Sequence, residues 1–214
     1  MITVLLADDD SLVRGGLKAL LRGEPDITVV GEVSNGRDAV ASAHALRPDV
    51  VVMDIRMPVR DGVSATRELM SAAPRPRVLV LTTFDLDEVV DDAIAAGADG
   101  FLLKRASPEE LVAGIRTVAA GDAVIASSVT RRLFEAHAAR TPADRGRTVR
   151  LTDREADVLR AMAGGLSNTE IARALHLSVE TVKTHVKHVL TKLEVRDRTQ
   201  AVVWAYRTGF AYRK

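Results

Sequence analysis

The sequence has no cysteine among its 214 residues, which excludes a disulfide framework and a metal site built on thiolates. Its five histidines are scattered and show no spacing typical of zinc ligands. There is no N-terminal signal pattern, and no apolar run approaches the length of a membrane span. We therefore expect a soluble, cytoplasmic protein without membrane contacts.

What is present points to two domains of opposite charge. Apolar residues make up 47% of a chain long enough to bury two modest cores, so disorder is not expected. The net charge of +1 conceals an asymmetry: residues 1–120 hold 13 Lys and Arg against 19 Asp and Glu, a balance of −6, and residues 121–214 hold 17 against 10, a balance of +7. The basic second half favours nucleic acid as its partner.

One short segment carries the chemistry of the first half. Val50–Asp54 is an apolar run bounded by turn formers, which predicts a strand buried on both faces. Its last residue, Asp54, lies where open α/β sheets place their ligand sites. A lone carboxylate there is more often a helix cap or a salt-bridge partner. However, a second apolar strand, Val4–Ala7, is followed by Asp8, Asp9 and Asp10, and two acidic strand ends imply a pocket for a cation.

Residues 2–120 alternate between strand and helix patterns, which predicts a doubly wound α/β fold with a five-stranded parallel sheet and helices on both faces. The expected strands are Thr3–Ala7, Thr28–Val33, Val50–Asp54, Val78–Thr82 and Gly100–Leu103. The expected helices are Leu12–Arg22, Gly36–Leu46, Gly62–Ser71, Leu86–Ala96 and Pro108–Ala120. The C-terminal strand ends share one edge, and that edge collects Asp8, Asp9, Asp54, Thr82 and Lys104.

With these motifs, residues 1–120 resemble the receiver domain of a two-component response regulator, a flavodoxin-like fold. The resemblance is carried by Asp8-Asp9, Asp54 with Met57-Pro58, Asp61-Gly62, Thr82, Gly97-Ala98-Asp99-Gly100-Phe101 and Lys104. It implies that Asp54 accepts a phosphoryl group, whose oxygens Thr82 and Lys104 bind. It also implies that Phe101 is the aromatic residue that moves when the domain switches.

The same resemblance implies a Mg²⁺ site. Asp9, Asp54 and the backbone carbonyl of Arg56 would bind the ion directly, and Asp8 would act through its hydration shell. A few carboxylate oxygens together with several waters are the ligands that Mg²⁺ prefers. Asp10, which extends the acidic pair, is expected to be solvated.

Residues 121–150 separate the two halves. A helix is expected over Ser127–Ala139, and the polar segment Arg140–Thr148, which contains Pro and Gly, is expected to be an exposed linker. The predicted organisation is a receiver domain over residues 1–120, a linker with a helix over 121–150, and a second domain over 151–214.

The second domain is expected to be all helical. Thr152 and Glu155 form a capping box that begins its first helix. A second helix, Asn168–Leu175, is followed after a tight turn by a third helix that begins near Ser178. Two helices joined in this way are a helix-turn-helix.

The third helix has one buried and one polar face. Its apolar stripe consists of Val179, Val182, Val186, Val189, Leu190 and Leu193. Lys183, Thr184 and Lys187 share one patch on the opposite face. A lysine-rich face is usually only solvated, but the second helix of a helix-turn-helix enters the major groove of DNA, which favours a DNA-binding role.

Three motifs of this domain resemble the LuxR-type helix-turn-helix, and with the receiver they make the chain similar to NarL/FixJ-family response regulators. The motifs are Leu151–Glu155, Gly165–Ala172 and Ser178–His185. The resemblance implies a helix-turn-helix from Asn168 to Lys187, in which Lys183, Thr184 and Lys187 face base edges. It also implies that a fourth helix, near Arg198–Thr208 with Val202, Val203 and Ala205, contributes to dimerisation on DNA.

We therefore predict a phosphorylation-activated transcriptional regulator of a two-component system. A sensor histidine kinase would phosphorylate Asp54, and Thr82 and Phe101 would then move inward. This change would favour a homodimer or release the DNA-binding domain, which binds double-stranded promoter DNA. Beyond self-phosphorylation and autodephosphorylation at Asp54, no enzymatic activity is expected.

Two alternatives remain open at this point. An aspartyl-phosphate phosphatase usually needs an Asp-x-Asp pair, and here Asp54 is followed by Ile55 and Arg56, so a second acid is missing. A regulator that never uses phosphate is the other alternative. The intact set of polar groups argues against it, because an interaction module has no need of every one.

Overall fold

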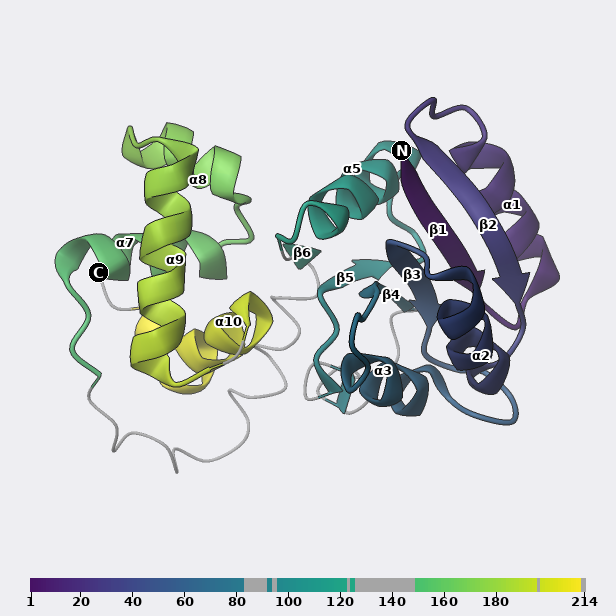
Figure 1. Cartoon of the computed structure of the whole chain (residues 1–214). Helices are drawn as coiled ribbons and strands as arrows, with labels where there is room; N and C mark the ends of the chain where they lie inside the picture. Colours follow the sequence, from purple (N-terminus) through teal and green to yellow (C-terminus); the bar gives the residue numbers. More distant parts are fainter. Residues whose placement is uncertain (83–91, 94–95, 123, 126–148, 196, 213–214) are drawn as a thin grey trace. The chain divides into compact units, whose positions relative to one another are not determined.

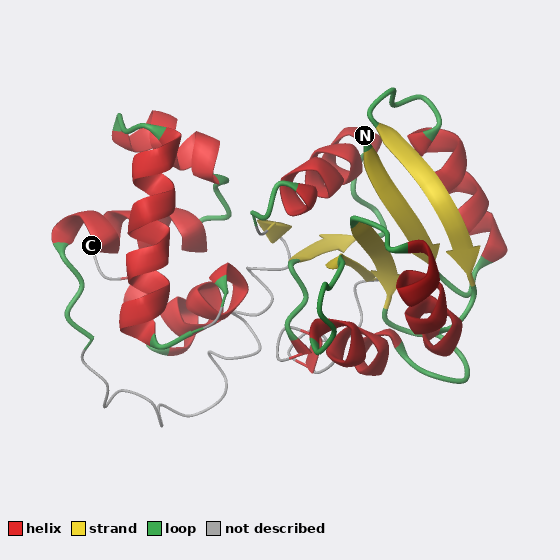
Figure 2. Ribbon diagram, viewed as in Figure 1, coloured by secondary structure: helices red, strands yellow, loops and turns green. Residues whose placement is uncertain are grey.

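The computed structural model describes residues 1–82, 92–93, 96–122, 124–125, 149–195 and 197–212. It divides the chain into two compact units, Met1–Val124 and Ile125–Lys214, which are described separately below (Figures 1 and 2). The predicted helix over Ser127–Ala139 and the predicted linker over Arg140–Thr148 lie outside the described residues, as does most of the helix predicted over Leu86–Ala96.

A parallel sheet forms the centre of the first unit, with the strand order β2-β1-β3-β4-β5-β6 (Figure 2). The strands are β1 Ile2–Ala7, β2 Ile27–Val33, β3 Val50–Asp54, β4 Arg77–Thr82, β5 Gly100–Leu103 and β6 Val124–Ile125. Strands β1 to β5 pair in parallel, which confirms the predicted doubly wound sheet, with bounds within one residue of those predicted. The short strand β6 was not predicted, because two residues carry no readable periodicity.

Helices cover both faces of this sheet, because the chain steps from β1 to β2 in one direction and from β2 to β3 in the other, and right-handed crossovers then lie on opposite faces. They are α1 Ser11–Leu21, α2 Gly36–Leu46, α3 Gly62–Met70 and α5 Pro108–Ala119. Helices α2 and α3 pack side by side on one face, and α1 and α5 lie on the other (Figure 1). All five residues of β3 are buried between these layers, which accounts for its uninterrupted apolar sequence.

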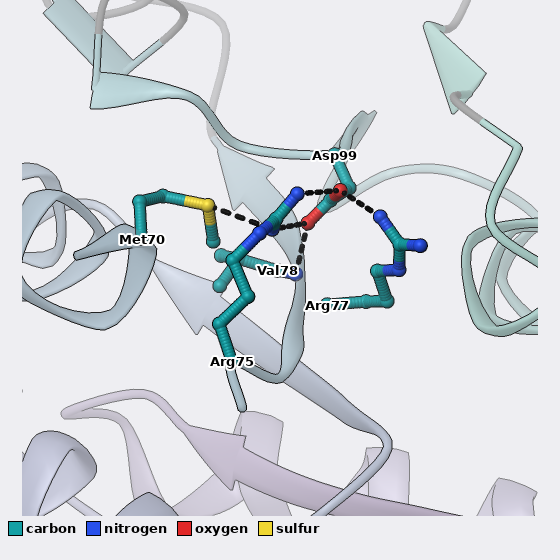
Figure 3. A network of polar contacts seen from close by, with 5 residues as sticks. All are labelled: Met70, Arg75, Arg77, Val78 and Asp99. Atoms are coloured by element: carbon teal, nitrogen blue, oxygen red, sulfur yellow. Dashed lines mark hydrogen bonds and ion pairs between the residues drawn. The ribbon is translucent and has the colours of Figure 1, made fainter. Parts of the chain in front are cut away.

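A network around Asp99 fixes the edge of the sheet opposite to the predicted site (Figure 3). Arg75 donates to both carboxylate oxygens of Asp99 at 2.9 and 3.1 Å, and Arg77 donates to Oδ1 at 2.9 Å. The backbone N–H of Val78 donates to Oδ2 at 3.0 Å. Asp99 therefore joins the start of β5 to the start of β4, which gives a structural reason for an acid at this place in the motif.

Over residues 149–195 and 197–212, the second unit forms four α-helices and a 3₁₀ turn. They are α7 Asp153–Ala163, α8 Asn168–Leu175, α9 Val179–Leu193, α10 Arg198–Arg207 and η1 Phe210–Tyr212. The predicted capping box is present, with Glu155 N–H donating to Thr152 Oγ1 and Thr152 N–H donating to Glu155 Oε2. Ser178 caps α9 as predicted. His176 ends α8 in the left-handed region with φ of 53°, which turns the chain tightly into α9.

A group of aromatic side chains closes the C-terminal end of this unit and was not predicted. The hydroxyl of Tyr206 donates to the carbonyl oxygen of Ala163 at 2.6 Å, which joins α10 to the end of α7. The rings of Trp204 and Phe210 lie 5.9 Å apart, and the guanidinium of Arg160 lies 5.4 Å from the centre of the Phe210 ring.

None of the helices in the described part of the chain is long and apolar enough to span a bilayer.

Candidate functional site

Four strands deliver the predicted site residues to one edge of the sheet. The register sets Asp54 at the end of β3 beside Leu81 of β4, and Thr82 beside Leu103 of β5. Asp8 follows β1 directly, and Lys104 follows β5 directly. Asp8, Asp54 and Thr82 are 2%, 6% and 1% exposed, so the polar groups at this edge are withdrawn from bulk water.

Lys104 joins the two buried carboxylates. Its Nζ lies 2.7 Å from Asp8 Oδ2 and 3.1 Å from Asp54 Oδ2. Its backbone N–H donates to the carbonyl oxygen of Thr82 at 2.8 Å, which fixes the end of β5 against the end of β4. The structure therefore brings Asp8, Asp54, Thr82 and Lys104 together, as the strand pattern predicted.

Burial and charge act in opposite directions on this site. Burial raises the pKa of Asp54, and the neighbouring Asp8 raises it further, whereas the Lys104 ammonium lowers it; the net pKa is raised. Burial lowers the pKa of Lys104, but the hydrogen bond with Asp8 and the charge of Asp54 outweigh it and raise the net pKa. Lys104 thus remains a cation, and Asp54 is a carboxylate that further positive charge would stabilise.

The carboxylates fit a hard divalent cation. Asp8, Asp9 and Asp54 each offer an oxygen, and these oxygens lie within 4.8 Å of one another. Asp8 Oδ2 is buried, and the Lys104 ammonium lies beside it at 2.7 Å. Three carboxylates against one ammonium leave excess negative charge, and oxygen donors of this kind suit Mg²⁺.

An open cleft of about 650 Å³ gives access to this edge of the sheet. Asp9 and Arg56 both line it, together with the loop after β3. The backbone carbonyl of Arg56 as a metal ligand stays a prediction, although this residue lies on the same cleft as Asp9.

The loops around the site are held by helix caps. Asp10 is exposed as predicted, but it also caps α1, because its Oδ1 accepts from the N–H of Leu12 at 2.8 Å, while its own N–H donates to Asp8 Oδ1 at 3.0 Å. Asp61 caps α3 by accepting from the N–H of Ser64 at 2.7 Å. These bonds hold the loops after β1 and β3 in the conformations that present Asp8 and Asp54.

Gly62 belongs to the site although it carries no side chain. Its N–H donates to the carbonyl oxygen of Ile55 at 2.8 Å, and a Cβ at this position would lie 1.9 Å from the carbonyl oxygen of Asp54. Only glycine allows the start of α3 to approach the end of β3 so closely. The Asp-Gly pair in the sequence marks this contact.

Phe101 is fully buried in this structure, and Thr82 is nearly so. Both side chains therefore occupy interior positions, and their movement on phosphorylation stays a prediction. Thr83, the neighbouring hydroxyl, lies outside the described residues.

In the second unit, α9 exposes the predicted patch. Val182, Val189 and Leu193 are buried against the other helices. Lys183, Thr184 and Lys187 are exposed, as the helical period predicts. The Thr184 hydroxyl donates to the carbonyl oxygen of Glu180 at 3.0 Å, so its proton is used within the helix.

The three residues of α10 that were predicted to contribute to dimerisation differ in how far they are buried. Val202 and Ala205 are 1% and 0% exposed and belong to the core of this unit, while Val203 is half-buried. A contact of α10 with a second copy would thus use Val203 and not the other two. The helical spacing did not distinguish the inner face of this helix from the outer face.

A buried arginine was missed from the sequence. Arg198 and Asn168 are 8% and 4% exposed, and Arg198 Nη1 donates to Asn168 Oδ1 at 3.0 Å. Its Nη2 donates to the carbonyl oxygen of Leu166. Arg198 therefore connects the start of α10 to the start of α8 and holds the helix-turn-helix in place. A single arginine in a basic domain gives no signal of burial.

Comparison with known proteins identifies the families of both domains. Residues 4–116 match the family described as "Response regulator receiver domain", and residues 149–205 match "Bacterial regulatory proteins, luxR family". A Bacillus subtilis relative, "Uncharacterized transcriptional regulatory protein YxjL", is 43% identical over 97% of this chain and 96% of its own length. "Response regulator protein VraR" of Staphylococcus aureus is 40% identical over 96% of each chain.

Solved structures of the same kind cover nearly the whole chain. The crystal structure of the response regulator ChrA of a heme-sensing two-component system is 37% identical, covers 98% of both chains and gives a TM-score of 0.57. A structure of two RcsB dimers bound to DNA is 25% identical, covers 97% of this chain and 98% of its own, and gives a TM-score of 0.57. The chain belongs to the response regulators of two-component systems that combine a receiver domain with a LuxR-type DNA-binding domain.

Proposed function

We propose that Asp54 accepts a phosphoryl group from a sensor histidine kinase in a Mg²⁺-dependent step, and that this switches promoter binding by α9. The observation that carries the proposal is the convergence of Asp8, Asp9, Asp54 and Lys104 at one buried edge of the sheet. A nucleophilic carboxylate, a cation beside it and a group of metal-binding oxygens are the parts that phosphoryl transfer needs.

In the transfer, an Asp54 carboxylate oxygen attacks phosphorus, and the bond from phosphorus to the donor nitrogen breaks. The product is an acyl phosphate, and the nitrogen keeps the electron pair of the broken bond. Lys104 pairs with the incoming phosphoryl oxygens, and the Thr82 hydroxyl donates to one of them. Mg²⁺, held by Asp9, Asp54 and the Arg56 carbonyl with Asp8 behind its waters, would neutralise the charge of the phosphoryl group.

The output is sequence-specific binding to double-stranded promoter DNA by a homodimer. Lys183, Thr184 and Lys187 face base edges in the major groove, and the lysines also attract phosphates, so affinity falls as salt rises. The dimeric, DNA-bound arrangement of RcsB, a relative in structure, supports this assembly. Two half-sites about one helical turn apart, or a multiple of it, would follow from the two-fold symmetry.

The proposed division of labour is a receiver domain over residues 1–120, a linker over 121–150 and a DNA-binding domain over 151–214, in a cytoplasmic protein. Apart from self-phosphorylation and autodephosphorylation at Asp54, the proposal assigns no catalytic turnover. This matches the family, whose members regulate transcription through DNA.

The test is intact mass spectrometry after incubation with a small phosphodonor and Mg²⁺, and separately with a cognate kinase. Wild type is expected to gain a single phosphoryl group, and Asp54→Ala is expected to gain none. Asp26→Asn is the control, because it changes an exposed carboxylate away from the site, and it is also expected to gain one phosphoryl group. An adduct that persists in Asp54→Ala would move the phosphoacceptor elsewhere. No adduct from either donor would make the receiver a phosphate-independent interaction module.

A further inference from the structure

An acidic side chain begins the stripe of α9 that is proposed to read DNA. Glu180 lies in the first turn of the helix, and Lys183, Thr184 and Lys187 follow at i+3, i+4 and i+7, the spacing of one helix face. All four residues are exposed. The N-terminal residues of a recognition helix are the ones that contact base edges, so this carboxylate lies where the helix enters the groove.

Glu180 and Lys183 form an ion pair that is easily exchanged for other partners. Lys183 Nζ lies 3.1 Å from Glu180 Oε1, and the side chains are 50% and 82% exposed for the lysine and the glutamate. Water screens a pair this exposed, so the pair contributes little to folding. It nevertheless holds one hydrogen-bond donor and one acceptor over the same part of the helix surface.

A carboxylate at this position opposes binding to most DNA sequences, because phosphates repel it and most base edges offer it no donor. Two bases present an amino donor in the major groove, cytosine and adenine, and a carboxylate pairs best with cytosine, because adenine holds the acceptor N7 beside its amino group. The guanine paired with that cytosine offers O6 and N7 to a lysine.

We propose that Glu180 is a specificity-determining residue, which accepts a hydrogen bond from a cytosine amino group while Lys183 donates to guanine in the same or the adjacent base pair. The inference rests on the proposed function of α9. Lysines alone attract DNA of any sequence. Glu180 adds discrimination, since at a site without the cytosine its carboxylate loses water without gaining a donor from a base and still faces the phosphates' charge.

Glu180 also has a structural role in the helix, and the test must distinguish this role from base recognition. An acid in the first turn interacts favourably with the positive end of the helix dipole, and a pair at i and i+3 stabilises the helix. Such a role changes the melting temperature of the second unit but leaves the choice of base unchanged. Base reading changes the sequence that the protein selects.

The experiment is selection from a random-sequence duplex library with the full chain, comparing wild type, Glu180→Gln and Glu194→Gln. Glu194 caps the other end of α9, so it provides the same charge change about 20 Å away along the helix axis. Wild type and Glu194→Gln are expected to select the same motif, with one strongly preferred cytosine in each half-site. Glu180→Gln is expected to lose that preference by roughly tenfold and to accept adenine there, because a glutamine amide suits the adenine edge.

Two results would overturn the inference and are distinguishable. If wild type selects a motif and Glu180→Gln selects the same one with the same strength, Glu180 is only a helix-stabilising residue and the proposed function stands. If wild type selects no motif with or without phosphodonor, the proposed DNA-binding function itself fails, and the role of Glu180 fails with it.

Discussion

At the scale of single residues, Lys104 decides the charge balance of the sheet edge that holds Asp8 and Asp54. It is the cation that lies between Asp8 and Asp54, and its two ion pairs are partly buried. Even so, burial and Asp8 keep the pKa of Asp54 above its ordinary value. The site therefore carries unfavourable negative charge, which a bound cation would relieve.

Replacing Asp54 by asparagine should stabilise the first unit in Mg²⁺-free buffer at pH 7. A group whose pKa is raised in the folded state destabilises the fold wherever it is ionised, and asparagine removes that charge. The gain should shrink as the pH falls through the raised pKa, where wild-type Asp54 becomes protonated. Urea unfolding at several pH values measures it. A variant less stable than wild type at pH 7 would contradict the desolvation argument.

Gly62 gives a second prediction at this scale. In Gly62→Ala the new Cβ would meet the Asp54 carbonyl oxygen, a backbone atom that cannot move aside. The free energy of unfolding should fall by about 3 kcal/mol, and phosphoryl uptake should fall with it. Gly16→Ala is the matched control, because Gly16 lies in α1 with open space around it. It should raise the free energy of unfolding by about 0.5–1 kcal/mol. Equal effects of the two changes would be inconsistent with this packing.

The sequence was sufficient to predict the residues that depend on strand ends alone. Asp8, Asp54, Thr82 and Lys104 each follow an apolar run, and a parallel sheet brings such ends together. The roles of Asp10 and Asp99 were not predictable in the same way. The cap is a local contact, but Asp10 follows two other acids and was taken for a solvated extension of them. The bidentate contact of Asp99 with Arg75 joins residues 24 positions apart, and no local pattern records that.

At the scale of elements, a partly buried ion pair joins the first helix of the DNA-binding unit, α7, to the proposed recognition helix, α9. Lys192 of α9 lies 2.6 Å from Glu155 of α7, which is 4% exposed and also closes the capping box with Thr152. Burial raises the pKa of Glu155, but the hydrogen bonds from Lys192 and Thr152 outweigh it and lower the net pKa. The angle between α7 and α9 depends on this carboxylate.

Glu155→Gln should therefore destabilise the second unit by about 1–2 kcal/mol at pH 7, because a hydrogen bond to a charged group is lost. Since the pKa of Glu155 is lowered, its contribution is present above the ordinary value of 4.5 and is lost as the pH falls through the lowered pKa. Glu170→Gln is the control, because Glu170 closes the analogous box with Ser167, and it should have a smaller effect. Thermal unfolding at pH 7 and pH 4 checks both. A pH-independent difference would contradict the assignment.

Strand and helix patterns gave nearly all the described elements, because each strand of the sheet interior is continuously apolar and each helix begins at a side-chain cap. They failed for β6, which is too short to show a period, and for the inner face of α10. Val202, Val203 and Ala205 are all apolar, so no polar residue among them marks which side meets the core. Packing against α7 and α9 decides that question.

At the scale of the whole molecule, the first unit should become more stable when Mg²⁺ is added, because the ion would bind the folded state and not the unfolded one. Mg²⁺ at 100 times its dissociation constant should raise the free energy of unfolding by about 2.7 kcal/mol. Asp9→Asn should abolish most of this gain, since Asp9 supplies one of the three clustered oxygens. Asp10→Asn is the matched control, because asparagine is as good a helix cap as aspartate. Loss of the gain in both variants would mean a diffuse charge effect and not a site.

The division into an acidic and a basic half anticipated the two compact units, since each half builds its own core and carries its own site. The charge pattern does not predict how the two units are coupled. Coupling requires that the phosphoryl group interact more favourably with one state of the chain than with another.

The most direct test of the account is the DNA affinity of the full chain before and after treatment with phosphodonor and Mg²⁺, measured by fluorescence anisotropy on a selected operator. Wild type should bind more tightly after treatment, by about 5–150-fold, the usual range of allosteric coupling. Asp54→Ala should show no change with treatment. An equal gain in Asp54→Ala, or no gain in a wild-type protein shown by mass to be phosphorylated, would contradict the proposal that Asp54 controls the DNA-binding domain.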